Sequence, residues 1–107
     1  MDQMSPAALR LLANRFKLLA SPTRLAIMQC ICHDERTVGE LVELTGFKQA
    51  NVSRQLGLLH RGGMVRRRTA GTSVHYTIAD ESLPQLCGIM RESLRASQDE
   101  LLASLGD

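Results

Sequence analysis

Six basic side chains and no acidic side chain lie between residues 44 and 79. The formal net charge of the chain is only +2, so the residues outside this segment together carry a net charge of −4. A concentrated positive surface attracts a polyanion such as a nucleic acid. The segment therefore favours a small DNA-binding regulator. The six residues are Lys48, Arg54, Arg61, Arg66, Arg67 and Arg68.

Amide and hydroxyl side chains accompany the positive charges from residue 48 to residue 55. On a helix that begins near Lys48, we expect them to share the solvent face. Asn and Gln can bind adenine in the major groove, and Arg can bind guanine. Lys48, at the start of the helix, is better placed for a phosphate. The predicted reading face consists of Lys48, Gln49, Asn51, Ser53, Arg54 and Gln55.

A basic hairpin follows this helix. Residues 64–69 and 73–78 alternate as strands around a turn at residues 70–72. Alternation sends Arg66 and Arg68 to one side and Arg67 to the other, so the three cannot contact the same phosphates. We expect at least one of them to contact the DNA backbone. The candidate contacts of the hairpin are Arg66, Arg67, Arg68, Thr69, Thr72 and His75.

The elements that position these residues show clear boundary signals. Ser5-Pro6 and Ser21-Pro22 each pair a helix cap with a proline at the first helical position, which predicts helices over about 6–20 and from 22 onward. Thr37 and Glu40 form a capping box, and Gly46 ends that helix in a left-handed conformation. The predicted helix-turn-helix spans about 37–61, and its second helix buries Val52, Leu56 and Leu59. The wing spans about 64–78.

A last helix over about 82–105 carries an apolar seam near heptad spacing, interrupted by Ser97. So small a domain offers this seam little to pack against, and a second copy of the chain is the natural partner. The seam consists of Leu83, Cys87, Met90, Leu94, Leu101 and Leu105.

Composition restricts the function classes. Residues 1–107 are expected to form a single domain. No apolar run approaches the roughly 18 residues of a membrane span, and no signal peptide is visible, so we expect a cytoplasmic protein. No catalytic motif occurs, which argues against an enzyme, and no cofactor is predicted. The remaining alternative class is a winged-helix module that binds another protein.

Three thiols could act as sensors: Cys30, Cys32 and Cys87. An odd number argues against a disulfide framework and favours reduced thiols. Side chains two apart on a helix diverge by about 200°, so Cys30 and Cys32 cannot readily chelate one ion. Three interpretations stay open: inert packing, a redox or sulfur sensor, and binding of arsenite or a soft metal.

Residues 11–80 resemble the ArsR/SmtB family of winged-helix repressors. The resemblance rests on five segments: residues 18–25 (LLASPTRL), 37–41 (TVGEL), 47–59 (FKQANVSRQLGLL), 63–65 (GMV) and 74–78 (VHYTI). The resemblance implies a mainly α fold in which four helices precede a small β-hairpin and a last helix. It also implies a homodimer joined through the first and last helices, an imperfect inverted-repeat operator on double-stranded DNA, and repression relieved by a signal.

The chain departs from the family pattern at several positions. Lys48 replaces the usual Ser or Thr cap, and Gln55 stands where His is common, which leaves the base preference open. In the family's metal sites, an Asp-x-His would begin the last helix and a Cys-x-Cys would begin the third. Here Glu81 and Ser82 follow Asp80 and the last helix contains no histidine, while Thr37 and Gly39 stand at the two cysteine positions, so neither of these family metal sites is predicted.

The family pattern leaves the role of the thiols open. In this family the second helix often neighbours the last helix. Cys30 and Cys32 are on the second helix, so either thiol could approach Cys87. Thiol-sensing members of this family resemble one another in a pair of cysteines, one late in the second helix and one well into the last. The corresponding residues here are Gln29 and Arg95, which carry no thiol.

Overall fold

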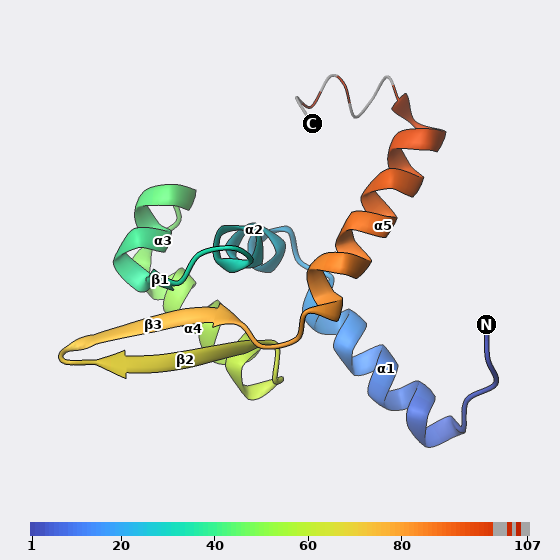
Figure 1. Ribbon diagram of the computed structural model, residues 1–107, viewed down its shortest axis with the longest axis horizontal. Coiled ribbons are helices and arrows are strands. Elements are labelled where there is room, and N and C mark those ends of the chain that lie inside the picture. The colour runs from blue at the N-terminus through green and yellow to red at the C-terminus, as the bar shows by residue number, and fades with distance from the viewer. Residues whose placement is uncertain (100–102, 104, 106–107) are drawn as a thin grey trace.

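The computed structural model describes residues 1–99, 103 and 105, and their arrangement is drawn in Figure 1. The β2–β3 hairpin projects from one side of the molecule, beside α2, α3 and α4. Helices α1 and α5 diverge on the opposite side (Figure 1). The elements in order are α1 (Pro6–Leu19), α2 (Pro22–Ile31), β1 (Arg36–Thr37), α3 (Val38–Thr45), α4 (Gln49–Arg61), β2 (Val65–Ala70), β3 (Ser73–Ile78) and α5 (Ser82–Ser97).

The helices begin where side chains can accept their first free amides. Ser5 Oγ accepts from the Ala8 amide at 3.1 Å, and Ser21 Oγ accepts from the Arg24 amide at 3.3 Å. At α3 the capping box is reciprocal: Thr37 Oγ1 accepts from the Glu40 amide at 3.2 Å, and Glu40 Oε1 accepts from the Thr37 amide at 2.9 Å. These three predicted starts are confirmed.

Replacing Thr37 by Ala removes the cap of α3 and is expected to lower the free energy of unfolding by about 1 kcal/mol. Urea denaturation followed by circular dichroism measures the change. Thr72→Ala is the matched control, because Thr72 is exposed at the hairpin turn. Equal midpoints for the two variants would mean that the cap contributes nothing.

The sheet has one strand more than the sequence predicted. β1 pairs antiparallel with β3 through Arg36 opposite Tyr76 and Thr37 opposite His75, which gives the order β1-β3-β2. The sequence pattern predicts only the two strands of the hairpin, at about residues 64–69 and 73–78. A strand of two residues is too short to show alternation, so periodicity could not reveal it. The predicted hairpin is confirmed, with Val65 opposite Ile78 and a turn at Gly71, where φ is 62°.

The core lies between α2, α3, α4 and the root of the hairpin. Val52, Leu56 and Leu59 of α4 are fully buried, as the spacing predicted. Burying this stripe turns the opposite side of α4 toward solvent. The buried apolar residues are Ile27, Met28, Ile31, Leu41, Val52, Leu56, Leu59, Met64, Val65, Ile78 and Leu83.

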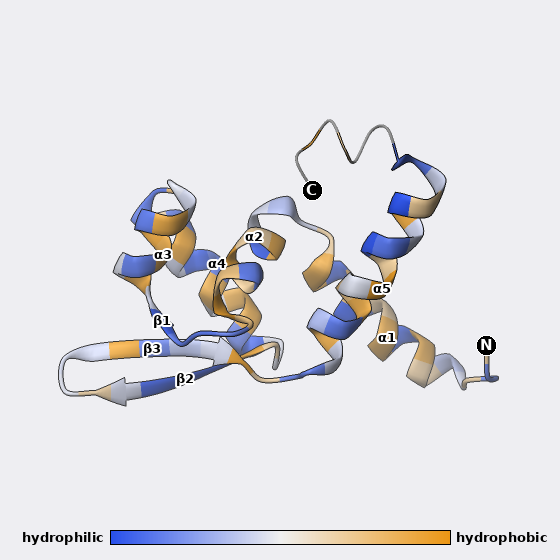
Figure 2. Cartoon of the chain, turned by 45° about the horizontal axis from the view of Figure 1, so that its top comes forward, coloured by the Kyte–Doolittle hydropathy of each residue, from blue (hydrophilic) through white to orange (hydrophobic). Residues whose placement is uncertain are grey.

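The first and last helices leave apolar surface uncovered. Helix α1 has no buried residue, and Phe16 is 47% exposed. On α5, Ile89 is 67% and Leu94 is 48% exposed. Hydrophobic segments run along both helices in Figure 2. An apolar surface of this kind, on two diverging helices, is suited to a partner.

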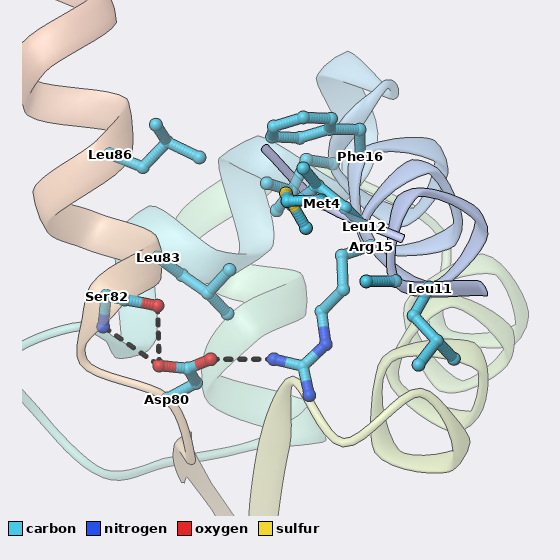
Figure 3. Close-up of a pocket in the computed structure, with 11 residues that line it drawn as sticks. Met4, Leu11, Leu12, Arg15, Phe16, Asp80, Ser82, Leu83 and Leu86 are labelled. Carbon is cyan, nitrogen blue, oxygen red and sulfur yellow. Dashed lines mark hydrogen bonds and ion pairs between the residues drawn. The ribbon is translucent and has the colours of Figure 1, made fainter. Parts of the chain in front are cut away.

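A groove of about 370 Å³ separates α1 from the start of α5 (Figure 3). At its edge, Arg15 donates to Asp80 at 2.7 Å. Hydrogen bonds from Ser82 lower the pKa of Asp80 below its usual range, and Arg15 lowers it further. The carboxylate therefore stays ionised and joins α1 to the loop before α5.

Helix α5 ends earlier than predicted. The structure ends it at Ser97, whose Oγ donates to the carbonyls of Ser93 at 3.0 Å and Leu94 at 3.3 Å. A serine that bonds back to the preceding turn competes with the helical backbone. The predicted continuation to 105 falls partly on residues 100–102 and 104, outside the described residues. Of the helices that the structure describes, none combines the length and apolar character that crossing a bilayer demands.

Candidate nucleic-acid interface

The outer side of α4 carries polar and basic side chains. Gln49, Ser53 and Arg54 are exposed, and Asn51 is half-buried. Lys48 occupies the N-cap position, is exposed, and makes no capping hydrogen bond with its side chain. The Lys48 charge therefore lies at the N-terminus of α4, where the helix dipole also favours an anion.

Gln55 does not lie on the solvent face, contrary to our prediction. Its side chain is 7% exposed, accepts from Arg24 Nη1 at 3.1 Å and donates to Asn51 Oδ1 at 3.1 Å. The physical reason is its partner: Arg24 of α2 supplies the hydrogen bond that makes burial of the amide favourable. The polar type of Gln55 suggested solvent, and an arginine 31 residues away could not be foreseen from local spacing.

Arg24 is a residue of this site that the sequence did not reveal. Its Nε donates to the Leu18 carbonyl at 2.7 Å, and its Nη2 donates to the Lys17 carbonyl at 3.2 Å. These carbonyls are at the C-terminal end of α1, where positive charge is favourable. One guanidinium thus ties the end of α1 to the inner edge of the reading face. The only sequence signal was an arginine in the first turn of a largely apolar helix.

The hairpin presents its arginines to solvent. Arg66, Arg67 and Arg68 are all exposed, as is Thr72 at the turn. Within residues 1–99, 103 and 105, no carboxylate forms an ion pair with Arg66 or Arg67. These two charges are therefore available to a polyanion.

Arg68 is instead held by Glu35. Its Nε donates to Glu35 Oε2 at 3.1 Å and its Nη2 donates to Oε1, while His75 Nδ1 lies 3.8 Å from Oε1. One acidic residue outside the segment 44–79 therefore lies against the basic hairpin. Pairing of β1 with β3 explains this, because it places Arg36 opposite Tyr76 and so brings the neighbouring Glu35 to the sheet.

The pairing also sets the pH range of this contact. The hydrogen bonds from Arg68 lower the pKa of Glu35 below its ordinary value of 4.5. A group whose folded pKa is lowered contributes stability above its unfolded pKa and loses it as the pH falls through the folded pKa. The Glu35–Arg68 pair is therefore intact at neutral pH and opens only in acid.

The three thiols lie in two places. Cys30 of α2 and Cys32, the residue just after this helix, pack against the core, and Cys32 Sγ donates to the Gln29 carbonyl at 3.1 Å. Cys87 is on α5, and all three are free and partly exposed. Among the described residues, no group of three or more His, Cys, Asp or Glu side chains is arranged to hold a metal ion.

Comparison with known proteins agrees with this architecture. Residues 21–67 match the family model "Bacterial regulatory protein, arsR family". The chain is 35% identical over 99 residues to the uncharacterised HTH-type transcriptional regulator Rv0081 of Mycobacterium tuberculosis, covering 92% of this chain and 87% of that protein. It is 32% identical to the arsenical resistance operon repressor of Bacillus subtilis, covering 86% of this chain and 93% of the repressor.

Solved structures give the same result. The crystal structure of Rv0081 superposes with a TM-score of 0.77 at 33% identity, covering 92% of this chain and 99% of that chain. The solution structure of the homodimeric winged helix-turn-helix DNA-binding domain Mb0332 from Mycobacterium bovis superposes with a TM-score of 0.73 at 31% identity, covering 87% and 89%. The chain therefore belongs to the ArsR/SmtB family of winged helix-turn-helix proteins and is a DNA-binding transcriptional regulator, not an enzyme.

Proposed function

We propose that the protein is a homodimeric repressor that binds an imperfect inverted repeat in double-stranded DNA. The observation that supports this most is the outer side of α4, which is polar, basic and exposed within a segment that contains no acidic residue. Two copies of α4 would enter successive major grooves, about one helical turn apart. Repression is supported by relatives such as the arsenical resistance operon repressor.

The contacts divide into two kinds. Gln49, Ser53 and Arg54 would read base edges, because they are exposed on the helix that enters the groove. Lys48, Arg66 and Arg67 would bind phosphates, which position the protein without reading sequence. Thr72 at the tip of the wing would join them. Arg68 and His75 reach phosphates only when Glu35 releases them.

Selection from a randomised duplex library tests the proposed function. We expect enrichment of an inverted repeat with half-site centres about 10 base pairs apart. Arg54→Ala should relax the preference at one base pair of each half-site, at a cost of roughly 1–3 kcal/mol. If the library yields no preferred sequence, the protein is not a sequence-specific reader.

The proposed repressor releases its operator on a signal, and a thiol signal is supported by the partial exposure of Cys30, Cys32 and Cys87. The selected duplex provides the assay, with reduced, oxidised, polysulfide-treated and arsenite-treated protein. Release from the wild type that disappears in one Cys→Ser variant identifies the sensing thiol. Unchanged binding after every treatment excludes a thiol signal.

Replacing Glu35 by Gln is expected to strengthen binding to all duplexes and to steepen the salt dependence by about 1.8 in slope, one phosphate contact in each copy of the dimer. The reason is that Arg68, now held by Glu35, becomes available to the DNA backbone. Asp34→Asn is the matched control, since it removes the same charge one residue away but contacts Arg36 instead. An equal gain in both variants would show that only net charge matters.

A further inference from the structure

Arg24 donates a hydrogen bond to Gln55, Gln55 donates one to Asn51, and chemistry fixes the direction of both. A guanidinium has only donors, so the group of Gln55 that faces Arg24 must be its carbonyl oxygen. The Gln55 NH2 group then faces Asn51, and the group of Asn51 that receives it must be Oδ1. The orientations of both amides thus follow from the arginine and not from an arbitrary assignment.

The orientation of Arg24 is itself fixed. Two of its nitrogens donate to the Leu18 and Lys17 carbonyls at the end of α1, at 2.7 and 3.2 Å. Gln55 is 7% exposed, so water cannot readily replace either of its partners. The direction of the hydrogen bonds is therefore imposed on α4 from inside the protein, before any DNA is bound.

This arrangement commits one half of the Asn51 amide. Its Oδ1 accepts from Gln55 at 3.1 Å and, more weakly, from Arg54 Nη2 at 3.4 Å. Bidentate reading of adenine by asparagine uses both the oxygen and the NH2 group. Because the buried Gln55 turns Oδ1 inward, the NH2 group is the half of the Asn51 amide that is left for the groove. Donors match the acceptor groups of guanine (O6 and N7) and thymine (O4), whereas adenine sets an N6 amino donor beside its single acceptor N7 and cytosine presents only its N4 amino donor.

We propose that Gln55 is a positioning residue that presets Asn51 as a hydrogen-bond donor, so that Asn51 selects a keto base, guanine or thymine, in each half-site. The inference rests on the proposed function, because it assigns the specificity of the same reading helix. It reverses the simplest expectation for an asparagine on a recognition helix, which is a preference for adenine.

Gln55→Glu tests the proposal by reversing the direction of the hydrogen bond between residue 55 and Asn51. The new carboxylate still accepts from Arg24, but it has no donor for Asn51. Asn51 then turns its NH2 group inward to the carboxylate and its oxygen outward to the groove. An outward oxygen matches the amino groups of adenine (N6) and cytosine (N4). The preference at the base read by Asn51 is expected to change from keto to amino.

The experiment selects duplexes from a randomised library with the wild type and with four variants, all checked for folding by circular dichroism and thermal unfolding. Asn51→Ala locates the base position, because the preference there disappears. Gln55→Met removes the imposed direction without adding charge, and should broaden the preference at that same position. Gln29→Glu is the matched control: it makes the same substitution at an exposed position of α2 and should leave every preference unchanged.

The expected result is a keto preference of about fivefold or more in the wild type and an amino preference in Gln55→Glu at the same position. A uniform loss of affinity in Gln55→Glu, with the wild-type preference kept, would overturn the proposal and leave Gln55 a structural residue. If Gln55→Glu does not fold, an unchanged preference in Gln55→Met overturns it equally.

The wild-type result separates this inference from the proposed function. A wild type that selects inverted repeats but prefers adenine through Asn51 refutes the inference alone. A wild type that selects no sequence refutes the proposed function and the inference together.

Discussion

The Met90→Glu protein is expected to sediment as a monomer and to bind the selected duplex about 100-fold more weakly than the wild type. The reason is that joining two DNA-binding domains in one dimer raises the affinity by roughly 10²–10⁴ through avidity. Met90 is 54% exposed on α5, and α1 has no buried residue. A carboxylate placed in an apolar interface loses its hydration without gaining a partner. Analytical ultracentrifugation measures the association, and fluorescence anisotropy measures the affinity.

Ser93→Glu is the matched control for this substitution. It adds the same charge to the same helix at an exposed polar position, and it should sediment as a dimer with nearly normal affinity. Leu94→Glu provides a second test of the apolar surface, since Leu94 is 48% exposed. Dimers in Met90→Glu and Leu94→Glu would show that the two chains meet elsewhere.

Replacing both Arg66 and Arg67 by Ala is expected to weaken binding to every duplex by at least about 10–100-fold, because even one hydrogen bond to a charged group contributes roughly 1.5–3 kcal/mol net of solvent competition. The slope of log affinity against log salt should become shallower by about 3.6, equivalent to two phosphate contacts in each copy of the dimer. Base preferences should not change, because phosphates carry no sequence information. Titrations of selected and random duplexes at several salt concentrations measure all three quantities.

The matched control removes Glu35 and Arg68 together by replacing both with Ala. These residues bind each other, so the double substitution leaves the net charge unchanged and should leave the salt slope nearly unchanged. A flattened slope in this control, with a normal slope in Arg66→Ala/Arg67→Ala, would assign the phosphate contacts to Arg68 instead.

Local signals sufficed for most of the architecture. Thr37 and Glu40 are three residues apart, so their capping box could be recognised from spacing alone. Gly46 ends α3 with φ of 75°, a conformation that favours glycine. Val52, Leu56 and Leu59 recur at helical spacing and are fully buried. Each of these features depends on neighbours within one or two turns of the chain.

The errors came from contacts between residues far apart in sequence. Gln55 meets Arg24 across 31 residues, and Glu35 meets Arg68 across 33. Composition correctly identified a segment without acidic residues, but it could not show that Glu35 folds back against the wing. Propensity likewise could not reveal β1, because a strand of two residues exists only through its pairing with β3.

The salt dependence of duplex binding by the wild-type protein tests whether the exposed basic surface of α4 and the hairpin binds DNA. Counterion release predicts that log affinity falls linearly with log salt, with a slope of about −0.9 for each phosphate contact. Lys48, Arg66 and Arg67 in both copies of a dimer predict a slope of about −5. Failure to retard any duplex at low salt, or an affinity that does not change with salt, would contradict a DNA-binding role for this surface.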